Sequence, residues 1–325
     1  MNPYEALARK SLANCPIDHE DIRWILTDES VHLLDLLSAA YKVRHHYFGN
    51  KVRVHIINNV QSGNCSEDCK YCAQSKDAPD QTVVYPMKTE EEILLEAKNA
   101  SEAGAYRYCM VYSGRDLGRN RIADICRVVG KIKARFDMEV CVSAGFLSSE
   151  EARALKSAGV DRYNHNLNTS RDFYPEICTT HDYARRIDTI NCANWSGLDI
   201  CSGVIIGMGE GTNDIASILS ELRRVEVKSV PINFFIPVPG HRVQPSGLTP
   251  HYCLKVLCLF RLALPKAEIR AAGGREYHLR SLQALCLYPA NSLFSKGYLT
   301  TGGECVAETK QMIIDSGFQV DAVAS

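Results

Sequence analysis

The feature that most restricts the fold is a regular alternation of strand-like and helix-like segments between about residues 50 and 300. Amphipathic stretches such as 90–104 and 149–160 separate short apolar runs, and no linker or low-complexity segment interrupts the series. Strands that alternate with helices build parallel sheets, and eight such units predict a (β/α)8 barrel of the TIM type. A doubly wound open sheet is the alternative, because a sequence pattern does not reveal whether a sheet closes. The strand-like runs are residues 52–58, 106–112, 138–145, 161–167, 199–207, 229–235, 267–273 and 291–294.

Residues 1–48 precede the first strand-like run and have a helical pattern. The stretch SVHLLDLLSAAYKVRHHYFG (30–49) carries a clear apolar stripe. The chain has 325 residues, 46% of them hydrophobic, which suffices for the core of one barrel. We therefore expect an N-terminal helical extension over residues 1–48 and one barrel domain over residues 49–325.

The charge balance argues against polyanionic partners. Lysine plus arginine total 37 and aspartate plus glutamate total 38, so the formal net charge is −1. No basic surplus points to nucleic acid or to an anionic membrane. No apolar run is long enough to span a membrane, and the start MNPYEALARK lacks the apolar core of a signal peptide. We expect a soluble, cytoplasmic protein that binds neither nucleic acid nor membrane.

The chain contains fourteen cysteines, and three of them are clustered in the stretch NCSEDCKYCAQS (64–75). Cytosolic thiols stay reduced, which favours metal or cluster ligation over disulfides. Cys65, Cys69 and Cys72 follow the first strand, at the face where barrel enzymes carry their chemistry. Three thiolates leave one iron of a [4Fe–4S] cluster open for another ligand. A zinc site completed by His55 or by a distant cysteine is the alternative.

Three further cysteines and one arginine lie in separate strand-like runs. Cys109, Cys141, Cys201 and Arg270 have no local spacing in common, so only closure of the barrel would bring them together. A single cysteine in a strand is usually an ordinary buried thiol. An arginine in an apolar strand is harder to explain in this way, because a buried charge has to be paired or ligated.

The clustered cysteines resemble a known family. The spacing CxxxCxxC, with Tyr71 before the last cysteine, resembles the signature of the radical S-adenosylmethionine (SAM) superfamily. The wider stretch SGNCSEDCKYCAQS resembles the biotin synthase family in particular. The resemblance extends over about residues 30–320, through YNHNLNTS (163–170), ICTTHDYARRIDT (177–189), CSGVIIGMGE (201–210), VPIN (230–233) and IRAAGGRE (269–276).

This resemblance implies a function, two cofactors and several partners. The implied reaction is sulfur insertion, which converts dethiobiotin to biotin. A [4Fe–4S] cluster on the catalytic residues Cys65, Cys69 and Cys72 would cleave SAM to a 5′-deoxyadenosyl radical. An auxiliary cluster, of the [2Fe–2S] type in this family, would donate the sulfur. Implied partners are a reducing electron donor such as flavodoxin or ferredoxin and a second copy of the chain in a homodimer. The ligands implied for the auxiliary cluster are Cys109, Cys141, Cys201 and Arg270.

Six residues are candidates for contacts with SAM or dethiobiotin. A glycine-rich turn such as GVIIGMGE (203–210) lets the backbone approach a nucleoside closely. An asparagine offers both a donor and an acceptor, which suits the ureido ring of dethiobiotin. By resemblance, the candidates are Asn166, Asn168, Arg186, Gly207 and Glu210 for SAM or its neighbour, and Asn233 for the ureido ring.

The remaining cysteines leave some questions open. Cys126, Cys253 and Cys258 fall on helical stretches, and we expect them to be packing residues; Cys15 is a surface or packing thiol. Four more cysteines have no counterpart in the family pattern, so a larger auxiliary cluster with another ligand set stays possible. The one nearest the end of the chain, Cys305, is a candidate for the active face. These four are Cys178, Cys192, Cys286 and Cys305.

Two other functions compete with sulfur insertion. One is a related radical SAM enzyme of cofactor biosynthesis or maturation, which would need no cysteines in its strands. The other is a non-catalytic iron–sulfur or zinc protein that senses redox state. Iron and sulfide content would separate the metal alternatives.

Overall fold

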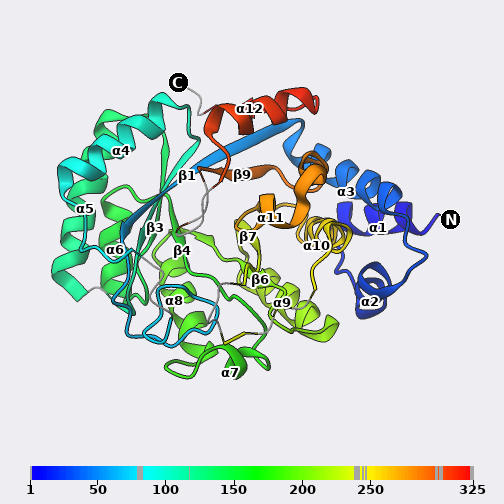
Figure 1. Cartoon of the computed structure of the whole chain (residues 1–325), viewed down its shortest axis with the longest axis horizontal. Helices are drawn as coiled ribbons and strands as arrows, with labels where there is room; N and C mark the ends of the chain where they lie inside the picture. Colours follow the sequence, from blue (N-terminus) through cyan, green and yellow to red (C-terminus); the bar gives the residue numbers. More distant parts are fainter. Residues whose placement is uncertain are drawn as a thin grey trace.

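A computed structural model describes residues 2–78, 83–116, 118–237, 242–243, 245, 247–296, 299 and 303–322 of the chain. Its centre is a ring of parallel strands (Figure 1). The last strand of the ring pairs with the first, so that Arg53 lies opposite Ser292 and Ile56 lies opposite Ser295. The sheet is therefore closed, which confirms the predicted (β/α)8 barrel and excludes the open sheet. In order around the ring the strands are β1 (Lys51–Gln61), β2 (Arg107–Tyr112), β3 (Glu139–Ser143), β4 (Arg162–Asn164), β5 (Asp199–Cys201), β7 (Ser229–Phe234), β8 (Glu268–Ala271) and β9 (Ser292–Ser295).

The strand expected over 199–207 is interrupted after Cys201. Its second half, β6 (Val204–Ile206), pairs with β7, while Gly203 N–H turns to Asn166 Oδ1 at 2.9 Å. A Cβ on Gly203 would lie 2.1 Å from Pro231 O, so only glycine allows this close approach. The prediction of one continuous strand is thus wrong, because the apolar run continues through a local break in the pairing. A short strand that was not expected, β10 (Gln319–Asp321), pairs with the start of β1.

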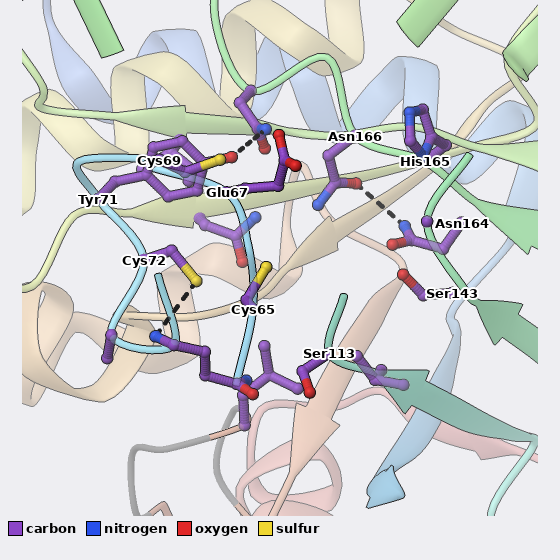
Figure 2. Close-up of a pocket in the computed structure, with 18 of the residues that line it drawn as sticks. Cys65, Glu67, Cys69, Tyr71, Cys72, Ser113, Ser143, Asn164, His165 and Asn166 are labelled. Atoms are coloured by element: carbon purple, nitrogen blue, oxygen red, sulfur yellow. Dashed lines mark hydrogen bonds between the residues drawn. The ribbon is translucent and has the colours of Figure 1, made fainter. Parts of the chain in front are cut away.

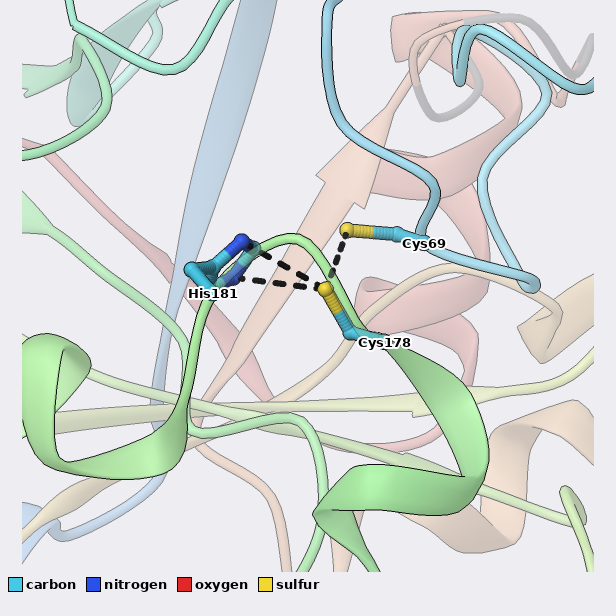
Figure 3. Close-up of side chains that lie close together, drawn as sticks. All are labelled: Cys69, Cys178 and His181. Atoms are coloured by element: carbon cyan, nitrogen blue, oxygen red, sulfur yellow. Dashed lines mark hydrogen bonds between the residues drawn. The ribbon is translucent and has the colours of Figure 1, made fainter.

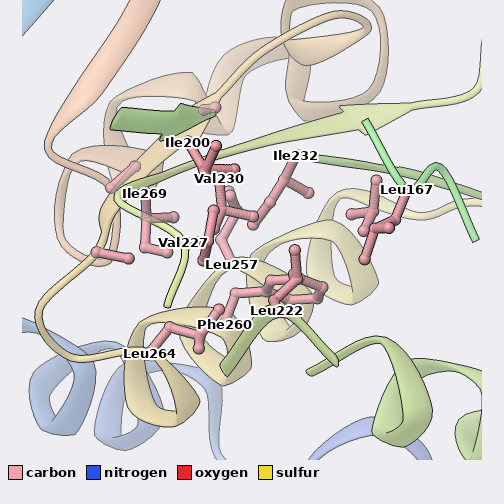
Figure 4. Close-up of a cluster of buried hydrophobic side chains, with 14 of the residues drawn as sticks. Leu167, Ile200, Leu222, Val227, Val230, Ile232, Leu257, Phe260, Leu264 and Ile269 are labelled. Carbon is pink, nitrogen blue, oxygen red and sulfur yellow. The ribbon is translucent and has the colours of Figure 1, made fainter. Parts of the chain in front are cut away.

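Helices cover the outside of the barrel. Alternation along the strands directs Ile200, Val230 and Ile269 outward, where they meet Leu222 and Phe260 of the covering helices (Figure 4). The inward face of the same strands carries polar residues. The helices are α1 (Pro3–Leu12), α2 (His19–Thr27), α3 (Leu33–Phe48), α4 (Glu90–Glu102), α5 (Gly118–Arg135), α6 (Ser149–Ser157), α7 (Tyr174–Ile177), α8 (Tyr183–Trp195), α9 (Thr212–Arg224), α10 (Pro250–Ala263), α11 (Arg275–Leu279), the 3-10 helix η1 (Arg280–Leu287) and α12 (Val306–Asp315).

The first three helices pack beside the barrel, where α3 contacts both α1 and α10 (Figure 1). Arg44 of α3 is fully buried and donates from Nη2 to Lys51 O at 2.8 Å, at the start of β1. The extension is thereby tied to the first strand. Among the described residues, no helix is long and apolar enough to cross a membrane.

A second buried arginine, Arg261 of α10, should be important for stability. It donates to Pro265 O at 2.9 Å, Ala267 O at 2.8 Å, Pro289 O at 2.9 Å and Asn291 Oδ1 at 2.6 Å. We expect Arg261→Met to lower the free energy of unfolding by about 3 kcal/mol, because buried carbonyl groups lose their donors. Thermal denaturation of the cluster-free protein measures this effect. The control is Arg23→Met on the exposed side of α2, and an equal melting temperature for the two variants would contradict the prediction.

Candidate active site

A cavity of about 330 Å³ opens at the carboxyl-terminal ends of the barrel strands. The loop after β1 forms one wall and carries Cys65, Cys69 and Cys72, all of which line the cavity (Figure 2). Asn164 and Asn166, from the end of β4 and the segment after it, lie across from them. The three cysteines of the motif therefore meet at one cavity, on the face where barrel enzymes carry their catalytic residues.

Two carboxylates hold the cysteine loop in place. Asp68 Oδ1 accepts hydrogen bonds from the backbone N–H groups of Thr179 at 2.9 Å and Thr180 at 3.2 Å, and Glu67 Oε2 accepts one from Thr180 Oγ1 at 2.6 Å. Burial alone would raise the pKa of Asp68, but its hydrogen bonds with Thr179 and its neighbours lower the pKa well below the usual range. The loop is thus fastened to the segment before α8. The CxxxCxxC spacing did not reveal this anchor, although Glu67 and Asp68 lie between its cysteines.

The thiols of the loop have to be deprotonated before they bind iron. Burial raises the pKa of Cys72 to about 11 and also raises the pKa of Cys65. Metal binding therefore has to displace protons, because the thiolate is the ligand form. Three thiols on one wall, with open volume beside them, fit a four-iron cluster whose last iron takes a small molecule.

A second group of metal-ligating side-chain types lies beside Cys69 (Figure 3). Cys178 Sγ is 3.8 Å from Cys69 Sγ and 3.4 Å from His181 Nδ1. His181 already uses both of its nitrogens, since Nδ1 bonds the Glu67 carboxylate and Nε2 accepts hydrogen bonds from two other side chains. We therefore interpret His181 as a support for its neighbours and not as a free metal ligand. Cys69 was predicted as a ligand, but its contact with Cys178 and the position of His181 were not, because only the fold brings Cys178 to the loop.

Arg186 contributes a fixed positive charge to the cavity. Its guanidinium donates to Tyr174 Oη, to Asn166 O at 3.0 Å and to His181 Nε2 at 3.0 Å. Burial alone would lower the pKa of Arg186, but the neighbouring Tyr71 and Tyr174 help to raise it above its usual range. Asn166 and Arg186, two of the predicted contacts, are thus linked to each other at the cavity wall.

Asn168 and Asn233 also line the cavity. Asn168 has a φ of 69° and donates from Nδ2 to Tyr71 Oη at 2.5 Å. Asn233 donates from Nδ2 to Val204 O at 3.0 Å, and its Oδ1 accepts from Gly273 N–H at 3.0 Å. Each amide therefore holds a neighbouring loop, and their contacts with a ligand stay predictions.

Gly207 and Glu210 lie in the turn after β6, and neither is among the described residues that line the cavity. Gly207 has a φ of 100°, and a Cβ there would come within 2.7 Å of Leu248 Cδ1. The Glu210 carboxylate accepts from Gly207 N–H at 2.7 Å and from Met208 N–H at 2.8 Å. The geometry of the turn itself thus explains these two residues, and their contact with a cofactor stays a prediction.

Beneath the cavity, the barrel interior contains a layer of sulfur atoms. Cys109, Cys141 and Cys201 extend from β2, β3 and β5, are at most 6% exposed, and pack together. Ser143 lines the cavity and lies two residues after Cys141, which places the sulfur layer directly below the cavity floor. Hydrogen bonds with Cys141, together with the charge of Arg270, lower the pKa values of Cys109 and Cys201.

Arg270 reaches the sulfur layer from β8. Its Nη1 lies 3.8 Å from Cys201 Sγ, while its Nη2 donates to Ser229 Oγ at 2.9 Å and Glu268 Oε1 at 2.5 Å. Its Nε is buried and has no hydrogen-bond partner among the residues that the structure describes. An unpaired buried donor beside three buried thiols, two of which have lowered pKa values, fits an anionic iron–sulfur centre in this layer.

A layer of charged side chains lies below the sulfur atoms, and it was not predicted. Strand alternation places residues two apart on the same face, so the pattern could have revealed it. Burial alone would raise the pKa of Glu268 in this layer, but Arg107 and other cations lower it well below the usual range. The pairs that share a face are Arg107 with Cys109, Glu139 with Cys141, and Glu268 with Arg270.

His55 belongs to the charged layer and not to the cysteine loop. Its Nε2 lies 3.3 Å from Glu268 Oε1, and its ring contacts Arg107 Nη1. It does not line the cavity, so the zinc site completed by His55 is wrong. Alternation along β1 directs this side chain into the barrel, well before the strand reaches the loop.

The other cysteines lie away from the cavity or in the core. As predicted, Cys126, Cys253 and Cys258 are packing residues: Cys253 and Cys258 lie in the hydrophobic core, and the partly buried Cys126 packs against it. Cys305 is exposed and caps α12, and it does not line the cavity. Of the rest, Cys15 is exposed, Cys192 is partly buried on α8, and Cys286 is fully buried in η1.

Comparison with protein families and solved structures agrees with this architecture. Residues 60–222 match the Radical SAM superfamily, and residues 231–319 match the Biotin and Thiamin Synthesis associated domain. Among solved structures, methylornithine synthase has a TM-score of 0.82 at 19% identity, with 98% of each chain covered. The FeFe-hydrogenase maturase HydG from Carboxydothermus hydrogenoformans has a TM-score of 0.81 at 18% identity, covering 98% of this chain and 79% of that one. At these identities the solved structures support the fold alone.

Curated relatives are similar over nearly the whole chain. Biotin synthase of Magnetococcus marinus is 49% identical over 318 residues, which cover 98% of this chain and 99% of that protein. Biotin synthase of Acaryochloris marina is 50% identical over 297 residues, which cover 91% and 86%. The family resemblance seen in the motifs is thereby confirmed. Given this identity, the closed barrel and the cysteines at its cavity, the chain belongs to the biotin synthase family of radical SAM sulfurtransferases.

Proposed function

We propose that the chain converts dethiobiotin to biotin in the cavity above the sulfur layer, with SAM as the source of the radical. The observation that carries this proposal is the stacking of two cysteine sets in one barrel. Cys65, Cys69 and Cys72 line the cavity, and Cys109, Cys141 and Cys201 lie directly beneath its floor. A substrate held between the two sets would be within reach of both.

The cavity cysteines would hold a [4Fe–4S] cluster, and this cofactor, when bound, supplies the electron that cleaves SAM. Arg186 and Asn166 form a rigid pair on the facing wall, and we propose that they orient SAM through its charged and polar groups. Asn168, Gly207 and Glu210 complete the proposed contacts with SAM.

The sulfur layer would hold the auxiliary [2Fe–2S] cluster, with Arg270 as its fourth group, and this cofactor supplies the sulfur that enters the product. Asn233 lines the cavity above this layer, where its amide would meet the ureido ring of dethiobiotin. The unpaired Nε of Arg270 supports the assignment, because a protein seldom leaves a buried donor without a purpose.

An anaerobic assay with dethiobiotin, SAM and a reductant tests the proposal. We expect biotin and 5′-deoxyadenosine to form, and iron and sulfide to be present for two centres. 5′-Deoxyadenosine without biotin would instead indicate another radical SAM enzyme. A chain that contains iron but cleaves no SAM would indicate a non-catalytic protein.

Replacement of Arg186 tests the proposed SAM site. We expect Arg186→Ala to raise the Kd of SAM by about ten- to a hundredfold, because the variant loses a partly buried cation that is fixed by three hydrogen bonds. Equilibrium binding of SAM to the reconstituted protein measures the change. Arg224→Ala, at an exposed pair with Glu221, is the control, and equal SAM affinities for the two variants would refute this role.

Organisation and partners follow from the same proposal. We infer that residues 1–48 form a helical extension and residues 49–325 the catalytic barrel. Family membership supports a reducing donor such as flavodoxin or ferredoxin, a homodimer and a cytoplasmic location. The contact of α3 with α10 and β1 supports a structural role for the extension.

A further inference from the structure

Glu268 is the most heavily paired carboxylate in the barrel interior. Its side chain is 2% exposed and lies at the start of β8, two residues before Arg270. It also accepts a hydrogen bond from Ser229 Oγ at 3.1 Å. Four guanidinium groups approach its oxygens: Arg270 at 2.5 Å, Arg107 at 3.1 Å, Arg162 at 3.1 Å and Arg53 at 3.2 Å.

Three of these arginines have a second carboxylate, and Arg270 does not. Among the described residues, Glu268 is the carboxylate that pairs with Arg270. The other described contacts of Arg270 include no carboxylate: Ser229 Oγ at 2.9 Å, Cys201 Sγ at 3.8 Å and the ring of Phe294, whose centroid is 4.8 Å from Cζ. The second carboxylates of the other three are Glu139 for Arg107, Asp199 for Arg162 and Asp321 for Arg53.

We propose that Glu268 is the positioning residue for Arg270 at the auxiliary centre, an inference that rests on the proposed function. Glu268 and Ser229 hold Nη2 on the side away from the cysteines. The guanidinium is planar, so fixing Nη2 also fixes the direction of Nη1, which lies 3.8 Å from Cys201 Sγ in the sulfur layer. The ligand geometry of Arg270 is thus set by a residue that does not touch the centre.

Removing the charge of Glu268 should release Arg270. A glutamine at this position keeps an acceptor oxygen but loses the negative charge, so the Coulombic attraction that holds the guanidinium is lost. Arg107, Arg162 and Arg53 keep their second carboxylates and stay in place. Arg270 would then be the arginine that moves, driven by repulsion from the other cations around it.

The test compares the auxiliary centre in reconstituted wild-type protein and in Glu268→Gln. We expect auxiliary iron to be lost about ten- to a hundredfold faster, as for other supporting residues of metal sites. We also expect its visible and resonance Raman bands to shift in the direction seen in Arg270→Ala. In an Arg270→Ala background, Glu268→Gln should cause no further spectral shift. Glu139→Gln is the matched control, since it removes a carboxylate of the same network that bonds Arg107 and not Arg270.

Several outcomes would overturn the proposal. Glu268 would have only a structural role if Glu268→Gln kept the wild-type spectral bands and the wild-type rate of iron loss. The same conclusion would follow if the variant melted at a lower temperature with unchanged bands. If Glu268→Gln does not fold, Glu268→Asp decides, because it keeps the charge but withdraws the carboxylate from Arg270; wild-type bands in that variant overturn the proposal. Wild-type protein without an auxiliary centre would refute the proposed function together with this inference.

Discussion

We expect that replacing Cys65, Cys69 or Cys72 with alanine abolishes SAM cleavage and leaves the barrel folded. The three thiols lie on a loop, whereas the stability of the barrel comes from its strands and covering helices. A cluster that loses one of three ligands is no longer held, so we expect 5′-deoxyadenosine formation to fall by at least a hundredfold. Product analysis under reducing, anaerobic conditions measures this loss, and circular dichroism checks the fold. Full activity in any of the three variants would contradict the assignment.

The position of Cys178 sharpens this experiment. Its Sγ lies 3.8 Å from Cys69 Sγ, so it is the thiol placed to replace that ligand. Iron retained in Cys69→Ala should therefore disappear in the double variant with Cys178→Ala. Cys192→Ala, at a partly buried thiol of α8, controls for general effects of losing a cysteine.

The barrel could be predicted from the sequence because its signal is local and repeated. Each strand-like run has buried residues on both faces, and each is followed by a helical pattern, so small errors at the ends do not change the topology. Closure is the non-local step: the count of eight units favoured it, but only the pairing of β1 with β9 shows it. The break between β5 and β6 could not be predicted, since it depends on the contact of Gly203 with Pro231 of a distant strand.

The residues of the candidate site likewise fall into those that a local sequence signal predicts and those that only the fold brings together. Cys65, Cys69 and Cys72 are close in sequence, and their spacing alone predicted a common site. The gathering of Cys109 and Cys141 needed the barrel and the family resemblance, because no local spacing unites them. The anchor of the cysteine loop was missed for the same reason, since its partners lie far along the chain.

The charged layer is different, because a readable signal existed. Arg107 and Glu268 each lie two residues before a predicted ligand, so alternation alone places them inside the barrel. A buried charge needs a counter-charge, and two opposite charges on inward faces predict a pair. The structure has this pair at 3.1 Å. The interior thus has three levels, with charges below, sulfur in the middle and the open cavity above.

Because the two cysteine sets lie at different levels of the barrel, replacing those of the sulfur layer should have a second large effect. Alanine at Cys109, Cys141 or Cys201 should lower biotin formation by at least a hundredfold, while 5′-deoxyadenosine still forms. The cavity cysteines belong to another loop and line another level, so the cluster that cleaves SAM keeps its ligands. Measuring both products in the same anaerobic reaction separates the two centres.

The control for this experiment has to be an equally buried thiol. Cys286 is fully buried in η1, outside both sets, and we expect Cys286→Ala to make biotin at a nearly normal rate. A general effect of a cavity in the core would lower activity in this variant as well. Biotin formation at the wild-type rate in Cys141→Ala would place the sulfur source elsewhere, because Cys141 packs in one cluster with both other thiols of the layer.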